Sequence, residues 1–133
     1  MQNPKQLNPV TLAFLGDAVY EARVRTAIIT RHHSLSPGKL HYLCVQYVKA
    51  EGQYQALQAI QPLLSEEEQA IVRRGRNYSG VTAPKNADVR TYRYATGLEA
   101  LFGYLHLKGD TQRIDQLFDI ILQLNLDQYT EIV

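Results

Sequence analysis

Apolar residues recur on two sides of a helix predicted between Asn8 and Arg31. At about 100° per residue, one stripe holds Val10, Phe14, Val24 and Ile28, and the other holds Leu12, Leu15, Val19 and Ala22. Asn8 can cap the first free amides, and Pro9 suits the first helical position because it has no N–H to leave unpaired. A helix that is apolar on both sides is expected to lie at the centre of its domain.

The same helical period continues along the chain, broken by capping residues, prolines and glycines. Predicted helices cover residues 10–31, 39–50, 53–60 after a junction at Gly52, 66 to 74 or 76, 89–107, and a final stretch that starts at 110 or 111. Ser65 and Glu68 have the spacing of a capping box, Asp88 can cap the fifth helix, and Gly109 can end it. Because no stretch alternates as a strand does, the sequence predicts one all-α domain over residues 1–133.

Two carboxylates interrupt these apolar helices: Asp17 in the first and Glu99 in the fifth. A buried, unpaired carboxylate costs several kcal/mol, so each should be neutral, paired or bound to a metal ion. In one interpretation they pair with core arginines such as Arg23 or Arg93. In the other they face each other and hold Mg²⁺, which commonly binds one or two carboxylates together with waters and substrate phosphates. Periodicity alone leaves both open.

The net charge of +1 hides an uneven distribution. Residues 1–64 carry six Lys and Arg against three Asp and Glu, residues 65–93 carry six against four, and residues 94–133 carry two against six. The stretch 75–87 is rich in turn-forming residues and has no clear period. Basic residues and tyrosines surround it: Arg73, Arg74, Arg76, Lys85, Arg90 and Arg93, with Tyr78, Tyr92 and Tyr94. This composition suits contacts with RNA phosphates, and it equally suits a solvated mobile loop.

The sequence also predicts a cytoplasmic protein that does not enter a membrane. No apolar run approaches the roughly 18 residues of a membrane span. The first residues are polar and unlike a signal peptide. Cys44 is the single cysteine, so no internal disulfide can form, and a reducing compartment is the default.

Two segments of the predicted helices resemble the motifs of ribonuclease III catalytic domains. Leu12-Ala13-Phe14-Leu15-Gly16-Asp17-Ala18-Val19 is similar to the family signature, roughly E-R-L-E-F-L-G-D-A-V. Residues 95–105, ATGLEALFGYL, are similar to the second motif, approximately A-D-x-x-E-A-L-I-G-x-L. Arg73-Arg74-Gly75-Arg76-Asn77 and Pro84-Lys85-Asn86, together with the short chain, resemble the Mini-ribonuclease III branch, which lacks a double-stranded-RNA-binding domain.

This resemblance implies a homodimeric endonuclease domain with Asp17 and Glu99 as catalytic, metal-associated residues and Mg²⁺ as cofactor. The chain departs from the family at three acidic positions, which are Val10, Ala13 and Thr96 here. With Asp17 and Glu99 as the direct ligands, a second ion would need water, phosphate or Thr96 to complete its shell.

The resemblance also implies a substrate and two surfaces. The substrate would be double-stranded RNA, a stem in the precursor of 23S ribosomal RNA, cut to 5′-phosphate and 3′-hydroxyl ends. RNA contacts are expected from Arg73, Arg74, Arg76, Lys85 and Arg90. Phe14 and Leu15 are expected at the dimer interface. The alternative is a non-catalytic RNA-binding or ribosome-associated protein with the same fold. The sequence leaves open whether a ribosomal protein presents the RNA.

Overall fold

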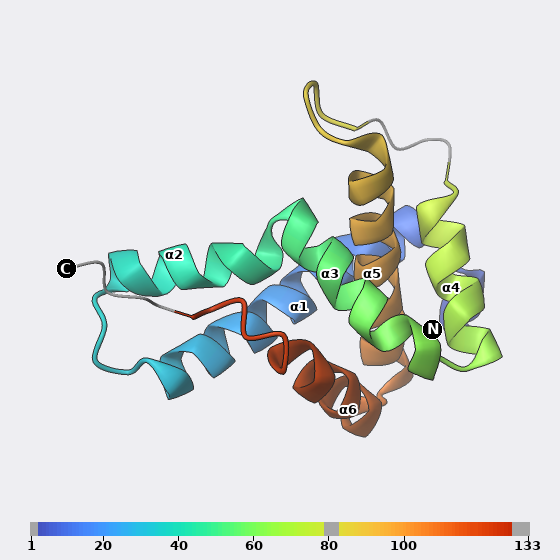
Figure 1. Cartoon of the computed structure of the whole chain (residues 1–133). Helices are drawn as coiled ribbons and strands as arrows, with labels where there is room; N and C mark the ends of the chain where they lie inside the picture. The colour runs from blue at the N-terminus through green and yellow to red at the C-terminus, as the bar shows by residue number, and fades with distance from the viewer. Residues whose placement is uncertain (1–2, 79–82, 129–133) are drawn as a thin grey trace.

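The computed structural model describes residues 3–78 and 83–128, and these residues form helices and connecting segments without strands (Figure 1). The prediction of an all-α fold is confirmed. The elements in chain order are η1 (Pro4–Gln6), α1 (Pro9–Arg31), α2 (Pro37–Val48), α3 (Ala50–Ile60), η2 (Gln61–Leu63), α4 (Glu66–Arg76), α5 (Val89–Lys108) and α6 (Thr111–Leu122). None of these helices is long and apolar enough to cross a membrane.

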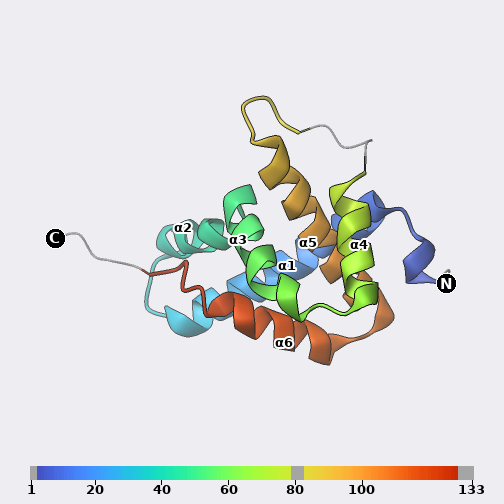
Figure 2. The ribbon, with the colours of Figure 1, turned by 45° about the vertical axis from the view of Figure 1, so that its right-hand side comes forward.

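Helices α1 and α5 cross at the centre of the molecule, and α3 and α4 lie on either side of α5 (Figures 1 and 2). Glycines allow the close crossing. A Cβ atom on Gly16 would lie 1.6 Å from the carbonyl oxygen of Glu99, and one on Gly103 would lie 1.9 Å from that of Leu12. No side chain fits at those distances, so the two backbones touch directly.

The predicted caps set the helix ends. Asn8 accepts a hydrogen bond from the amide of Val10 at 2.8 Å, and Ser65 and Glu68 form the complete capping box. Asp88 caps α5, which ends at Gly109 with φ of 80°. One boundary prediction was wrong: the junction between α2 and α3 lies at Lys49. Gly52 is buried inside α3, where a Cβ would lie 2.1 Å from the carbonyl oxygen of Gln46.

Helix α1 lies at the centre of the molecule, as expected, but only one of its apolar sides is fully covered. Leu12, Tyr20, Val24 and Ile28 are fully buried and join side chains of the other five α-helices in one apolar cluster. Phe14, by contrast, is 82% exposed, and Val10 is also exposed. The neighbouring helices cover one side of α1 and leave part of the other open.

Two buried carboxylates fasten the outer segments to this core. Glu68 of α4 accepts hydrogen bonds from Arg113 of α6 at 2.8 Å. Burial by itself would raise the pKa of Glu68, but the bonds from Arg113 and Ser65 outweigh it and hold the pKa below its ordinary value. Asp127, beyond α6, is 3% exposed and is bound by Arg31, His32 and Tyr47. These bonds tie the last described turn to α1 and α2.

Candidate active site

The structure brings Asp17 and Glu99 together. Asp17 directly follows the glycine at which α1 meets the backbone of Glu99, so the helix crossing itself places the two carboxyl groups side by side. Both line a surface hollow of about 270 Å³. The other lining residues are Val10, Ala13, Phe14, Tyr92 and Thr96. The hollow therefore holds two acidic oxygen donors at the edge of an apolar surface.

The two carboxylates differ in their surroundings. Glu99 is partly buried, and burial, followed by the adjacent Asp17 carboxyl group, raises the pKa of Glu99 to about 8. Asp17 is exposed, so the expectation that it is buried among apolar side chains was wrong. The reason is the outward stripe of α1, whose apolar residues near Asp17 face the hollow rather than the core.

Gln53 is a site residue that the sequence did not reveal. It is 3% exposed on α3, and its side-chain amide donates a hydrogen bond to Glu99 that acts against the rise in pKa. A glutamine in an amphipathic helix carries no local signal of this role. Only the packing of α3 against α5 shows it.

Core arginines do not neutralise the pair, so that alternative was wrong. Arg23 of α1 forms its ion pair with Asp115 of α6. Arg93 borders a different hollow, next to Arg76 and Arg90. The Asp17 and Glu99 side chains instead hydrogen-bond each other, because burial and the charge of Asp17 favour the protonated form of Glu99, and a bound cation would take the place of the shared proton.

The donor set fits a divalent cation that keeps most of its water. Among residues 3–78 and 83–128, no cluster of three or more His, Cys, Asp or Glu side chains is placed to bind a metal. Two carboxylates in an open hollow match Mg²⁺, which is often held by one or two carboxylates plus waters and phosphates. Thr96 lines the same hollow, but its hydroxyl donates to the carbonyl of Tyr92 at 3.1 Å.

The basic residues expected to contact RNA fall into separate groups. Arg73 and Lys85 are exposed. Arg76 and Arg90 both lie against the Tyr94 ring. The guanidinium group of Arg74 instead donates to the carbonyl oxygens of Lys5 at 2.5 Å and Leu7 at 2.6 Å.

These contacts give Arg74 a structural role in holding the N-terminal segment, and RNA contact by this residue stays a prediction. Part of the predicted loop, residues 79–82, lies outside the described residues.

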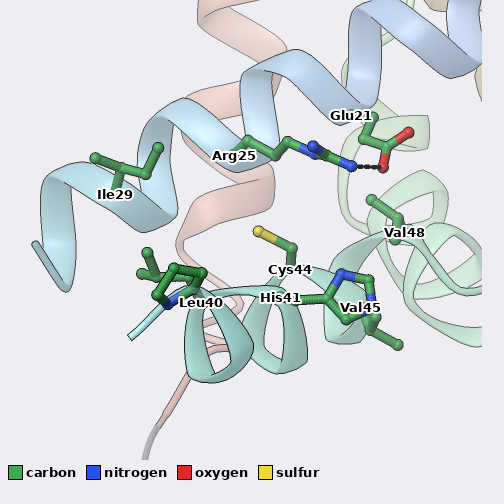
Figure 3. Close-up of a pocket in the computed structure, with 9 residues that line it drawn as sticks. Glu21, Arg25, Ile29, Leu40, His41, Cys44, Val45 and Val48 are labelled. Atoms are coloured by element: carbon green, nitrogen blue, oxygen red, sulfur yellow. Dashed lines mark hydrogen bonds and ion pairs between the residues drawn. The ribbon is translucent and has the colours of Figure 1, made fainter. Parts of the chain in front are cut away.

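A second hollow, between α1 and α2, is more apolar and does not contain the carboxylate pair (Figure 3). Arg25 and Glu21, both on α1, form an ion pair of 2.8 Å at its edge, and Cys44 of α2 also lines it. Burial raises the pKa of the Cys44 thiol, so the thiolate is disfavoured. We assign no chemistry to this hollow.

The helical fold corresponds to a known class of enzyme. Residues 10–110 match the profile of the Ribonuclease III domain, so the chain belongs to the ribonuclease III family of endoribonucleases. The crystal structure of protein FN1578 from Fusobacterium nucleatum is similar, with a TM-score of 0.81 and 28% sequence identity over 90% of this chain and 95% of that one.

Within the family, the similarity is to one group. The chain is 42% identical over 123 residues to Mini-ribonuclease 3 of Clostridium tetani, covering 92% of this chain and 82% of that protein. It is 47% identical over 118 residues to Mini-ribonuclease 3 of Thermoanaerobacter sp., covering 89% and 82%. The predicted resemblance to the Mini-ribonuclease III branch is confirmed.

Proposed function

We propose that this chain is a metal-dependent endoribonuclease that cleaves double-stranded RNA, with Asp17 and Glu99 as its catalytic residues. The observation that carries the proposal is the meeting of these two carboxylates, 82 positions apart in sequence, in one open hollow. Membership of the ribonuclease III family supports the reaction class.

The two carboxylates would hold the cofactor, which we propose is Mg²⁺. When bound, the ion supplies an activated water and neutralises charge on the leaving oxygen. Asp17 is exposed, so its oxygens are open to solvent and would be open to a substrate. Glu99 is instead oriented by the hydrogen bond that it accepts from Gln53. Phosphodiester hydrolysis of this kind leaves 5′-phosphate and 3′-hydroxyl ends.

The proposed substrate is a base-paired stem in the precursor of 23S ribosomal RNA, reached in the cytoplasm. The similarity to Mini-ribonuclease 3 proteins supports this choice. A-form RNA is bound largely through its shape, phosphates and 2′-hydroxyls, so exposed basic side chains are the expected contacts. Those proposed are Arg73, Arg74, Arg76, Lys85 and Arg90.

We further propose that two copies of the chain form the working enzyme. One hollow can cut one strand, so cleavage of both strands at one position needs two hollows. Phe14 is largely exposed beside the catalytic pair, and Leu15 next to it is partly exposed. Burying these side chains in a second copy would remove apolar surface from water.

A cleavage assay on a duplex RNA tests the proposal. The protein is incubated with the duplex in Mg²⁺ or in EDTA, alongside Asp17→Asn, Glu99→Gln and, as a matched charge control, Asp119→Asn on the exposed face of α6. We expect cleavage with Mg²⁺ by the wild type and the control only. The two site variants should still bind the duplex. Near-wild-type cleavage by either site variant would refute the assignment.

Metal binding is measured separately by thermal unfolding. Because the ion binds the folded state, Mg²⁺ should raise the melting temperature of the wild type and of Asp119→Asn, and raise that of Asp17→Asn much less. The alternative function, a non-catalytic RNA-binding protein, predicts duplex binding without cleavage at any Mg²⁺ concentration.

A further inference from the structure

Two guanidinium groups from different helices lie on one tyrosine ring. The Cζ atom of Arg76 lies 5.0 Å from the centroid of the Tyr94 ring, and that of Arg90 lies 5.4 Å from it. Both distances are within the range of a cation–π contact. Arg76 is the last residue of α4 and Arg90 is in the first turn of α5, so Tyr94 joins the two ends of the α4–α5 connection.

Tyr94 is itself held from two further directions. Its ring packs against that of Tyr54 on α3, with 5.0 Å between centroids and 46° between the planes. Its hydroxyl accepts a hydrogen bond from Arg90, which lowers the pKa of Tyr94. The ring therefore has a defined place from which it can orient both guanidinium groups.

The charges around Tyr94 are unbalanced. Arg76, Arg90 and Arg93 border one hollow of about 400 Å³, and within the described part of the chain none of them forms an ion pair. The nearby carboxylate, Asp88, caps the backbone amides of residues 90 and 91 and attracts Arg90 electrostatically. Three guanidinium groups beside one carboxylate leave an excess of positive charge that can bind an oxyanion, and the planar fork suits phosphate in particular.

This cluster lies on a different side of α5 from the catalytic hollow. Tyr94 precedes Glu99 by five residues, which is roughly 140° around the helix and about 7.5 Å along it. Tyr92 and Thr96, two residues before and two residues after Tyr94, line the catalytic hollow instead. An anion bound near Tyr94 would therefore be a phosphate away from the cleaved bond, important for binding and not for chemistry.

We propose that Tyr94 is a positioning residue that holds Arg76 and Arg90 as a clamp on one backbone phosphate of the duplex, outside the catalytic hollow. The inference rests on the proposed function, because it takes double-stranded RNA as the ligand. The proposal adds Tyr94, an uncharged residue, to the RNA-binding surface, where its role is to orient the two guanidinium groups.

The test measures duplex RNA binding in EDTA by fluorescence anisotropy over a series of salt concentrations. The variants are Tyr94→Leu, Tyr94→Phe, Arg90→Gln and the double variant Tyr94→Leu with Arg90→Gln. Tyr42→Leu on α2, at a tyrosine that is 62% exposed, is the matched control. Steady-state cleavage in Mg²⁺ gives kcat and KM for each, and melting temperatures show that each is folded.

We expect Tyr94→Leu to weaken duplex binding about five- to tenfold and to reduce the salt slope by about one, the effect of a lost phosphate contact. KM should rise while kcat stays within about twofold. Tyr94→Phe, which keeps the ring and loses the hydroxyl, should lie between Tyr94→Leu and wild type. In the Arg90→Gln background, Tyr94→Leu should cost less than it does alone, because the part of its effect that acts through Arg90 is already lost and only the part through Arg76 remains.

Wild-type affinity and salt slope in Tyr94→Leu would overturn the clamp, as would a full additional loss in the Arg90→Gln background or a loss confined to kcat. If Tyr94→Leu is unfolded, the same cycle with Tyr94→Phe decides the question. A wild type that binds no duplex overturns the clamp and the proposed function together. Cleavage that survives in Asp17→Asn overturns the proposed catalytic pair alone, because the binding measurements do not depend on cleavage.

Discussion

Glu99 is held between two side chains that act on its charge in opposite directions. Asp17 and the surrounding burial disfavour the carboxylate, and the hydrogen bond from Gln53 favours it. A buried amide that donates to a metal-binding carboxylate fixes which oxygen faces the ion. At the scale of single residues, the proposed metal site thus comprises three side chains, from α1, α3 and α5, rather than the two acids alone.

Gln53→Leu removes the amide that donates to Glu99 and places an apolar side chain of similar size in this buried position. Because the change leaves Glu99 without its orienting partner, we expect roughly 10- to 100-fold weaker Mg²⁺ affinity or cleavage. The measurement is cleavage rate against Mg²⁺ concentration. Gln58→Leu, at an exposed position of the same helix, should behave as wild type. Equal rates in both variants would remove Gln53 from the site.

At the scale of elements, the crossing of α1 and α5 builds the hollow proposed to be catalytic. The backbones meet at Gly16 and Gly103, and this contact brings Asp17 to Glu99, where their side chains share a hydrogen bond. The position of the site depends on how closely the two helices approach.

Gly103→Ala places a methyl group within 1.9 Å of the carbonyl oxygen of Leu12. The helices must separate to accept it, and overpacking of this kind costs about 1–3 kcal/mol or more. We expect a clear fall in the free energy of unfolding by urea titration, with cleavage reduced in the folded fraction. Gly38→Ala, where nothing lies within 4 Å of the added atom, is the control and should be neutral or slightly stabilising. Equal stability of the two variants would contradict the close crossing.

The contact between Glu68 of α4 and Arg113 of α6 should make the free energy of unfolding depend on pH. The pKa of Glu68 lies below its ordinary value of 4.5 in the folded protein, so its charged form stabilises the fold above pH 4.5. That contribution is lost as the pH falls through the folded pKa. Glu68→Gln should therefore be less stable than wild type near neutral pH, and the difference should shrink below pH 4.5. Urea unfolding at several pH values measures this, and a difference that is constant with pH would be contrary to expectation.

At the scale of the whole molecule, the exposed phenyl ring of Phe14 lines the same hollow as Asp17 and Glu99. An apolar side chain that is 82% exposed in the single chain favours burial against a partner. In a two-fold dimer each such contact occurs twice, so one residue has a large effect on assembly.

Phe14→Ser should convert a dimer into monomers, because it removes about 2 kcal/mol of apolar burial from each copy. Analytical ultracentrifugation at micromolar protein gives the mass directly. Leu63→Ser, at an apolar residue that is 53% exposed on η2, should leave the mass unchanged. A wild type that sediments as a monomer with the RNA bound would refute the dimer.

The sequence by itself determined the helices and their caps. Asn8, the Ser65–Glu68 box, Asp88 and Gly109 act on neighbouring residues, so their effect can be predicted without a fold. The two motifs identified the family for the same reason, since they are continuous stretches of chain. Asp17 and Glu99 could be singled out as carboxylates inside apolar helices, and the motifs then implied their role.

Only the tertiary structure decided what surrounds these residues. The exposure of Asp17 depends on which helices cover α1. Three further features involve segments far apart in sequence: the hydrogen bond from Gln53, the backbone contacts of Arg74, and the clustering of Arg76 and Arg90 on Tyr94. Helical period gives the angle of a residue around its own axis, but not which neighbouring helix covers that angle. Burial, charge pairing and the shape of the site depend on that packing.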